Sequence, residues 1–146
     1  MSVTLMGNAT KERLFAAGID NFFATIACVL LAAKLPGQLS PVARWVIAGM
    51  AYLVYFLVQE AIWGTTLGKR AFHLQVARVD GGSVGWPEAL WRTLLRILEV
   101  NPLLAGAIPG GLTVAFSKRK QRLGDMLAHT VVVHQTALAA AREPRA

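Results

Sequence analysis

Two carboxylate side chains lie in stretches that are otherwise apolar, where they could exchange protons or hold a cation. Asp20 interrupts an apolar run from about residue 14 to 35, and Glu60 lies near the end of a second run from about 42 to 63. A charged side chain at the centre of a membrane helix costs about 2.5–3.5 kcal/mol on insertion scales. Asp20 is therefore expected to face protein or water, and either to have a partner or to take up a proton.

Arginines are the natural partners for these acids. Arg13 precedes Asp20 by seven positions, which is two helical turns, so the two share a face but lie about 10.5 Å apart along the axis. That separation is too long for a direct ion pair, and partners from other helices are expected. Arg92 and Arg96 lie on the polar stripe of an amphipathic segment and could turn inward to Asp20 and Glu60. The same stripe could instead lie flat among lipid headgroups, with its arginines on phosphates, and both arrangements remain open.

The composition defines the kind of protein that must position these groups. The chain has 146 residues, is 55% apolar and only 16% charged, and has a mean hydropathy of +0.48. A soluble domain of this size has about 25% charged residues. Its single cysteine, Cys28, excludes a disulfide scaffold. The two apolar runs are each long enough to cross a bilayer, which takes about 20 residues of helix, and we predict transmembrane helices over 14–35 and 42–63.

Shorter elements are predicted beyond the second run. Helices are expected over 87–100 and 103–116, each too short to span comfortably, so they form an amphipathic or re-entrant pair. A turn at Asp80-Gly81-Gly82 predicts a small hairpin over 72–86, and the β-branched run 130–133 could add a third strand. The predicted fold is an all-α membrane bundle with a small cytoplasmic β-hairpin. It forms one domain over 1–136, followed by a frayed tail over 137–146.

The distribution of positive charge predicts the orientation. Basic residues flank the first helix, occur around the hairpin and follow the last apolar stretch as Lys118, Arg119, Lys120 and Arg122. Positive charge favours the cytoplasmic side, so both termini, the hairpin and this cluster are expected in the cytoplasm of a multi-pass protein of a prokaryotic plasma (inner) membrane. We expect the cluster to contact anionic lipid headgroups of the bilayer rather than nucleic acid.

Other apparent motifs predict no catalysis. Gly68-Lys69 is not a phosphate-binding loop, because Trp63 stands where a Gly is required and Arg70 replaces the Ser or Thr. Lys69 and Arg70 are interpreted as lipid-facing or loop-pinning cations. The three histidines have no ligand spacing with Cys28 or with a carboxylate cluster, so no metal and no cofactor is expected. No enzyme activity is predicted.

Four separated motifs resemble the RDD family of small prokaryotic membrane proteins, over about residues 11 to 134. They are Arg13 with Asp20; Gly64-Thr65-Thr66-Leu67-Gly68-Lys69-Arg70 leading into Leu74-Gln75-Val76; Arg92 with Arg96; and Gln121-Arg122-Leu123-Gly124-Asp125-Met126-Leu127-Ala128-His129-Thr130-Val131-Val132-Val133. The resemblance implies that Arg13, Asp20 and Asp125 are the arginine and two aspartates of the family name. It also implies that His129 stands where Gly is more common.

Two functions of different kinds follow. Some members of the family are associated with sodium/proton exchange, which implies transport through Asp20 and Glu60, tuned by Arg13, Arg92 or Arg96. Others accompany larger membrane assemblies, which implies a non-transporting accessory or scaffold subunit. Asp125 is interpreted as a structural carboxylate that pins the C-terminal segment to the cytoplasmic loop. A homo-oligomer or a larger membrane complex is expected in either case.

Overall fold

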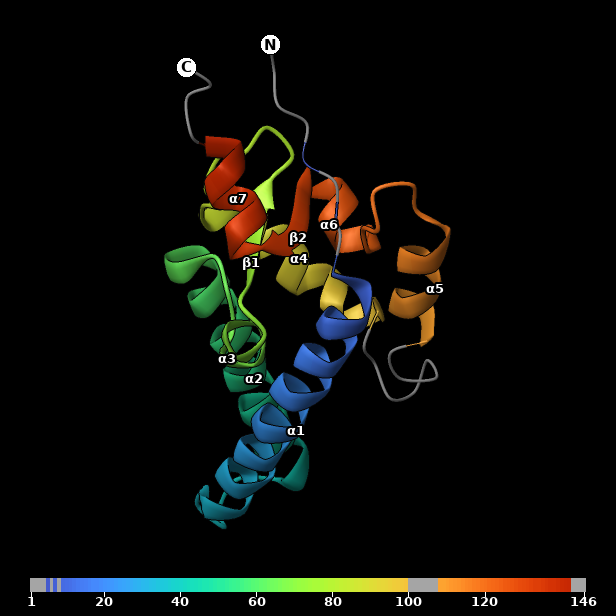
Figure 1. Ribbon diagram of the computed structural model, residues 1–146. Coiled ribbons are helices and arrows are strands. Elements are labelled where there is room, and N and C mark those ends of the chain that lie inside the picture. The colour runs from blue at the N-terminus through green and yellow to red at the C-terminus, as the bar shows by residue number, and fades with distance from the viewer. Residues whose placement is uncertain (1–4, 6, 8, 100–107, 143–146) are drawn as a thin grey trace.

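Two long helices form a hairpin that projects from a smaller head. The computed structural model describes residues 5, 7, 9–99 and 108–142, with no side-chain detail for 99 and 108–111. Figure 1 shows the pair at the bottom of the molecule, with the head and both termini at the opposite end. α1 runs over Thr10–Lys34 and α2 over Pro41–Trp63. These helices agree closely with the predicted spans.

Local sequence explains the bounds of α2. Ser40 accepts a hydrogen bond from the Ala43 N–H at 3.2 Å, and Pro41 occupies the first turn, where its missing N–H costs nothing. Gly64 ends the helix in the left-handed conformation, with φ of 62°.

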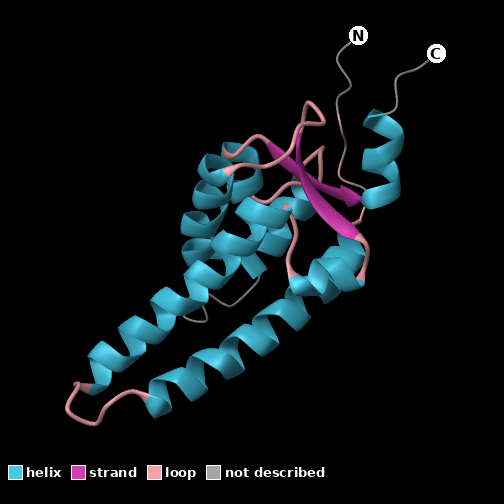
Figure 2. Ribbon diagram, turned by 90° about the vertical axis from the view of Figure 1, so that its left-hand side faces the viewer, coloured by secondary structure: helices cyan, strands magenta, loops and turns pink. Residues whose placement is uncertain are grey.

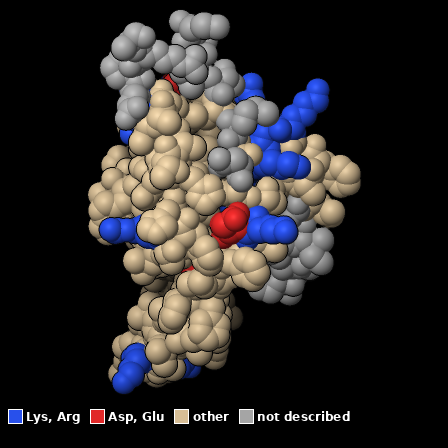
Figure 3. Space-filling view, in the orientation of Figure 1, with Lys and Arg blue, Asp and Glu red and all other residues tan. Residues whose placement is uncertain are grey.

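Both long helices are exposed rather than enclosed. Within their most apolar windows only 17% of α1 and 11% of α2 is buried. A core helix of a soluble protein is mostly buried, so this surface requires an apolar surrounding. In Figure 3 the shaft of the hairpin is largely free of charge on the visible face, whereas Lys and Arg gather at its tip and on the head.

The head contains short helices and one small sheet. Their bounds are α3 Leu67–Ala71, β1 Leu74–Arg78, α4 Trp86–Glu99, α5 Ile108–Phe116, α6 Leu123–Leu127, β2 Thr130–His134 and α7 Gln135–Arg142. The expected ends of the third and fourth helices at 100 and 103–107 lie outside the described residues. The segment expected to fray from 137 is helical as far as Arg142, because Leu138 is buried against the sheet.

The sheet corrects the predicted hairpin over 72–86. β1 pairs antiparallel with β2 over five residues, from Leu74 opposite His134 to Arg78 opposite Thr130. The turn around Gly81 forms, but the returning chain makes one isolated bridge, between Ala77 and Ser83. The return leg cannot extend because α4 begins at Trp86. The β-branched run proposed as a third strand is thus the partner of β1.

The two faces of the sheet pack against different helices. One face carries Leu74, Val76 and Val132, and packs with Ala16 of α1 and Ala89 of α4. The opposite face carries Ala77, Val131 and Val133, and packs with Leu138 of α7. Figure 2 shows α7 beside the strands and the long hairpin extending away from them. The sheet therefore separates α7 from the helices that form the hairpin and α4.

The order of elements repeats within the chain. α1, α2, α3 and β1 are followed by α4, α5, α6 and β2. Gly124 and His129 lie 56 positions after Gly68 and His73, and each histidine links a five-residue helix to a five-residue strand. Both histidines have positive φ, 53° and 50°. Because Val76 pairs with Val132, also 56 positions later, a local two-fold axis relates the two helix–strand units.

Candidate functional site: a buried ionic network

Asp125 joins three helices through its carboxylate. Arg13 Nη2 of α1 donates to Oδ2, and Arg92 Nη1 of α4 donates to Oδ1. The backbone N–H of Arg122 donates to Oδ2 at 2.9 Å, which caps α6. Asp125 is fully buried, so these donors replace the water it loses. The sequence predicted that Asp125 pins the C-terminal segment to the cytoplasmic loop, whereas its side-chain donors here come from α1 and α4.

Glu60 forms the second centre, at the end of α2. Lys69 Nζ of α3 donates to Oε1, and Arg92 Nε donates to Oε2 at 2.7 Å. Arg92 therefore bridges two acids, and its Nη1 also donates to Thr130 Oγ1 at 2.7 Å. The guanidinium of Arg92 thus links α4 to α2, α6 and β2, and its planar fork suits such shared contacts. α3 joins through the pair of Lys69 with Glu60.

We call Arg13, Glu60, Lys69, Arg92 and Asp125 the ionic network. Each is at least 93% buried. Three cations thus surround two acids in a region with little water, where an uncompensated charge is costly. Every one of these five groups has an ionic partner. Removing one group therefore leaves its partners with a buried charge that is less well compensated, which destabilises the fold.

Burial and charge shift the pKa values of network groups in the head. Burial lowers the pKa of the Lys69 ammonium to about 7, although Glu60 opposes the shift. Burial acts to raise the pKa of the Asp125 carboxyl, but the charges of Arg13 and Arg92 outweigh it and hold that pKa well below its usual range. Asp125 is therefore ionised throughout the physiological range.

Asp20 lies outside this network and has uncharged donors. Thr66 Oγ1 and the backbone N–H of Gly68 both donate to its carboxylate, the latter at 2.7 Å. A Cβ on Gly68 would overlap the carbonyl oxygen of Ala16, so glycine allows α3 to approach α1 this closely. The expected pairing of Asp20 with Arg92 or Arg96 is wrong, because α3 occupies its face. Arg92 is instead engaged by Glu60, as the sequence also proposed.

Arg96 packs on an aromatic ring rather than on an acid. Its guanidinium carbon lies 3.5 Å from the centroid of the Phe56 ring, a cation–π contact. Arg92, Thr93 and Arg96 are all buried, so the polar stripe of α4 faces inward. Of the two arrangements left open by the sequence, the structure has the inward one.

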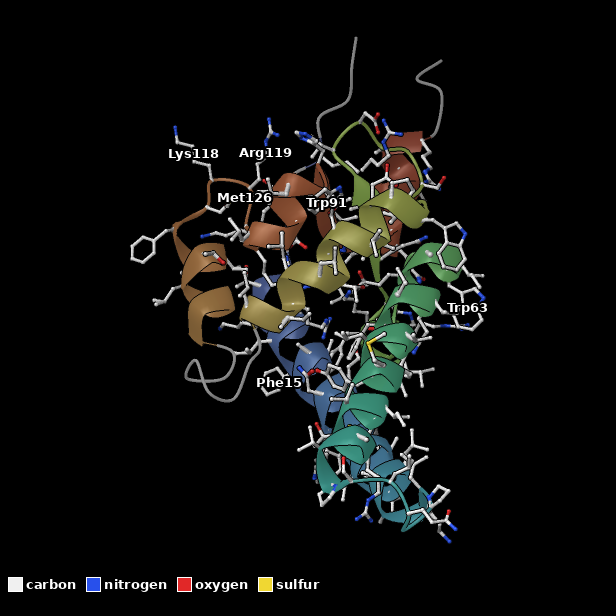
Figure 4. All side chains as sticks on the ribbon, turned by 180° about the vertical axis from the view of Figure 1, so that it is seen from behind. Phe15, Trp63, Trp91, Lys118, Arg119 and Met126 are labelled. Atoms are coloured by element: carbon white, nitrogen blue, oxygen red, sulfur yellow. The ribbon has the colours of Figure 1, made fainter. Side chains whose placement is uncertain are left out.

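The remaining predicted cations divide by exposure. Lys69 is buried against Glu60, so it is not lipid-facing and instead pins the segment after α2 to that helix, whereas Arg70 is exposed. Lys118 and Arg119 are exposed and extend toward the end of the molecule that holds the termini (Figure 4). Lys120 is half-buried, and its Nζ donates to the Ala115 carbonyl at 3.2 Å. Arg122, also half-buried, lies 3.9 Å from Asp125 and is turned partly toward the network.

Several uncharged polar residues of the site were not assigned roles from the sequence. Gln59 Oε1 accepts from the Leu67 N–H at 3.0 Å, and Gln121 Nε2 donates to the Thr130 carbonyl at 2.7 Å. Thr66 and Thr130 are fully buried and bind Asp20 and Arg92. Thr66, Gln121 and Thr130 lie inside the family motifs, which was the available signal, whereas Gln59 lies outside them. Amide and hydroxyl groups alone do not reveal which backbone segment they will contact.

The arrangement suits structural joining. Among the described residues, no three His, Cys, Asp or Glu side chains form a group that could hold a metal ion. Lys69, Arg92 and Arg13 instead tie α1, α2, α3, α4 and α6 together at the base of the long hairpin. These ion pairs hold the head and the long hairpin together.

Two exposed apolar helices with a buried charge network at their base define a helical membrane protein. The model of the RDD family matches residues 9–129, and the chain belongs to that family, as its motifs predicted. It is 32% identical over 104 residues to the uncharacterized membrane protein YteJ of Bacillus subtilis (strain 168). That alignment covers 70% of this chain and 60% of the relative, so the chain spans less than two thirds of YteJ. No solved structure matches the chain.

Proposed function

We propose that this protein is a non-transporting accessory or scaffold subunit of a larger membrane assembly, and not an enzyme. The supporting observation is that Glu60, one of the two acids that the transport hypothesis would use, is held by two side-chain cations, Lys69 and Arg92. Asp125, which the sequence predicts to be structural, is likewise held by Arg13 and Arg92. A carboxylate fixed in this way connects helices and stabilises their packing. Ion exchange would require those contacts to open in each cycle.

The charge balance also supports a structural role. Arg13 and Arg92 already balance the two acids, and the protonated form of Lys69 adds positive charge, so an entering metal cation meets no net negative charge. Removing a single partner from such a buried pair costs about 3–5 kcal/mol, which makes repeated opening expensive. Stability of the fold, rather than passage of a cation, is the property that this arrangement favours.

For the orientation, we infer a multi-pass protein whose termini lie in the cytoplasm and whose head lies at the cytoplasmic side of the membrane. The support is that exposed Lys118 and Arg119 lie at the end with the termini, opposite the hairpin tip (Figure 4). The head then presents the sheet, α7 and these cations to a cytoplasmic partner or to anionic headgroups. A homo-oligomer or a complex with another membrane protein would place the exposed hairpin against neighbouring helices.

Cation or proton exchange through Asp20 is the second candidate. Among the described salt bridges Asp20 has no cationic partner, and it is held by the hydroxyl of Thr66 and the N–H of Gly68. A buried carboxylate in a membrane helix with neutral donors can release its contacts at lower cost than a paired one. Transport would then involve Asp20 on α1 and its donors on and next to α3, while the ionic network holds these two helices in place.

Flux in proteoliposomes distinguishes the two functions. The full chain, Asp20→Asn and the exposed control Asp80→Asn are reconstituted at matched folding and incorporation, and sodium- and proton-gradient-driven fluxes are measured. The accessory role predicts the same background flux in all three samples. Flux that is present in the unmodified chain and in Asp80→Asn but absent in Asp20→Asn would establish exchange and overturn the proposal.

A partner is the positive expectation of the accessory role. Crosslinking in native membranes, followed by purification of the full chain, is expected to recover another membrane protein in a fixed ratio. Recovery of the chain alone, as a monomer that retains its fold, would contradict the accessory role even if no flux were seen.

A further inference from the structure

The amphipathic helix α4 buries its polar face and exposes its apolar face, which is the opposite of a surface helix on a soluble protein. Its polar residues Arg92, Thr93 and Arg96 are at most 5% exposed. Its apolar residues face outward, and five of them (Leu90, Trp91, Leu94, Ile97 and Leu98) are 44–55% exposed. A water-facing helix shows the opposite pattern, so the outer side of α4 requires an apolar neighbour.

α6 continues this apolar surface. Leu123, Met126 and Leu127 are 37–55% exposed, and α6 lies directly against α4. The close contact depends on Gly124, where a Cβ would come within 3.3 Å of the Arg92 Cα. Figure 4 shows Trp91 and Met126 near one another on the same side of the molecule. We call the five α4 residues above, with Leu123, Met126 and Leu127, the α4–α6 surface.

The sheet places this surface on the side of the membrane hairpin. Ala16 of α1, Ala89 of α4 and the partly buried Leu57 of α2 all pack with the sheet face formed by Leu74, Val76 and Val132. α7 packs with the other face. The local two-fold axis stands perpendicular to the sheet, so it keeps equivalent elements on the same face. α4 and α6 thus repeat the placement of α1 and α3.

We propose that the α4–α6 surface is embedded among the acyl chains of the leaflet that α1 and α2 enter from the head. The occupant is lipid, because the surface belongs to the same side as the exposed apolar α1 and α2. Lys118 and Arg119 are exposed just before α6 and extend away from the hairpin tip, where cations would meet anionic headgroups (Figure 4). The α4–α6 side of the head is then embedded in one leaflet, while α7, on the opposite face of the sheet, lies in water.

Fluorescence quenching by depth tests this proposal. The full chain with Trp45, Trp63 and Trp86 changed to Phe retains Trp91 alone, and is reconstituted in vesicles of phosphatidylcholine and phosphatidylglycerol. Brominated phosphatidylcholine quenches from the acyl region, and iodide quenches from water. A matched control replaces all four tryptophans with Phe and adds Ala139→Trp on the exposed side of α7.

We expect mid-chain bromine to quench Trp91 several-fold more strongly than the α7 control, and iodide to quench only the control. Quenching of Trp91 by iodide, with little effect of bromine, would overturn the proposal. Shielding of Trp91 from both quenchers would also overturn it, because a second copy or another protein would then cover α4.

A second reporter avoids dependence on the tryptophan changes. Leu94→Cys on α4 and Ala139→Cys on α7 are each introduced into a Cys28→Ser background. A membrane-impermeant maleimide, added with both faces of the membrane accessible, is expected to label residue 139 and to leave residue 94 unlabelled until detergent is added. Equal labelling of both positions before detergent would contradict lipid embedding.

Discussion

The carboxylate of Asp125 receives one arginine from each half of the chain, Arg13 and Arg92. In Asp125→Asn both guanidiniums lose a buried anionic partner, so we expect the free energy of unfolding to fall by about 3–5 kcal/mol. Asp80→Asn removes the exposed partner of Arg78 and should cost less than about 1 kcal/mol. Unfolding of the purified proteins in detergent measures both. Equal costs would contradict the structural role of Asp125.

The lowered pKa of Asp125 predicts acid sensitivity. Arg13 and Arg92 hold the folded-state pKa well below the unfolded value of about 3.9, so the ionised carboxylate contributes stability above that pH. The contribution is lost as pH falls below about 4, because the unfolded state then binds the proton more readily. Thermal unfolding at a series of acidic pH values should show a steeper loss for the unmodified chain than for Asp125→Asn. Parallel curves would exclude this linkage.

His129 occupies a backbone conformation that suits glycine. Its φ is 50°, and its side chain is exposed between α6 and β2. His129→Gly is expected to raise the free energy of unfolding by about 0.5–1 kcal/mol, because glycine accepts positive φ without the steric cost. His129→Ala retains a Cβ and should give no such gain. Thermal unfolding of the two variants checks this, and stabilisation by Ala to the same degree would contradict the conformational explanation.

At the scale of elements, three glycines form a graded test of helix contacts. A Cβ at Gly68 would overlap the Ala16 carbonyl oxygen, one at Gly124 would come within 3.3 Å of the Arg92 Cα, and one at Gly18 meets nothing within 4 Å. We expect Gly68→Ala to be the most destabilising, Gly124→Ala to have a smaller effect, and Gly18→Ala to stabilise by about 0.5–1 kcal/mol through helix propensity. Unfolding in detergent gives the order, and the reverse order would contradict the packing of α3 on α1.

The elements also show how far sequence reasoning reaches. The spans over 10–34 and 41–63 were predictable, because length and apolar composition determine a membrane helix almost alone. The partner of β1 was harder to predict, because the turn around Gly81 is a local signal whereas the pairing of β1 with residues 130–134 is non-local. A turn predicts where the chain reverses, and burial of both strands decides which pairing persists.

The sequence predicted which residue types form the site, but it predicted only some of the contacts between them. Buried charges in an apolar chain predict pairing, and Arg92 does pair with Glu60. The donors to Asp20 could not be predicted in the same way, because Thr66 and the Gly68 N–H reach it only through the close approach of α3 to α1. Such contacts depend on backbone placement in three dimensions, which local spacing does not define.

At the scale of the whole molecule, the chain consists of two related units joined by charge. The units meet at the paired strands, where Val76 lies opposite Val132. They also meet at Asp125, which binds Arg13 of the first unit and Arg92 of the second. The first unit has long membrane helices and the second has short ones. The same order of elements therefore forms the membrane hairpin in the first unit and part of the head in the second.

The shared guanidinium of Arg92 makes Glu60 and Asp125 energetically dependent on one another. Removing either acid alone leaves Arg92 with the other acid as an ionic partner, whereas removing both acids takes away both of these buried carboxylates. The double substitution should therefore cost more than the sum of the single ones, by about 0.5–3 kcal/mol.

The most direct test of the central claim, that the ionic network is a structural joint, is this coupling free energy. It is measured by unfolding the unmodified chain, Glu60→Gln, Asp125→Asn and the double variant under identical conditions in detergent. The network predicts that each single variant is destabilised and that the double variant loses more than the two single losses combined. Single variants as stable as the unmodified chain, or losses that simply add, would contradict a joint built on Arg92.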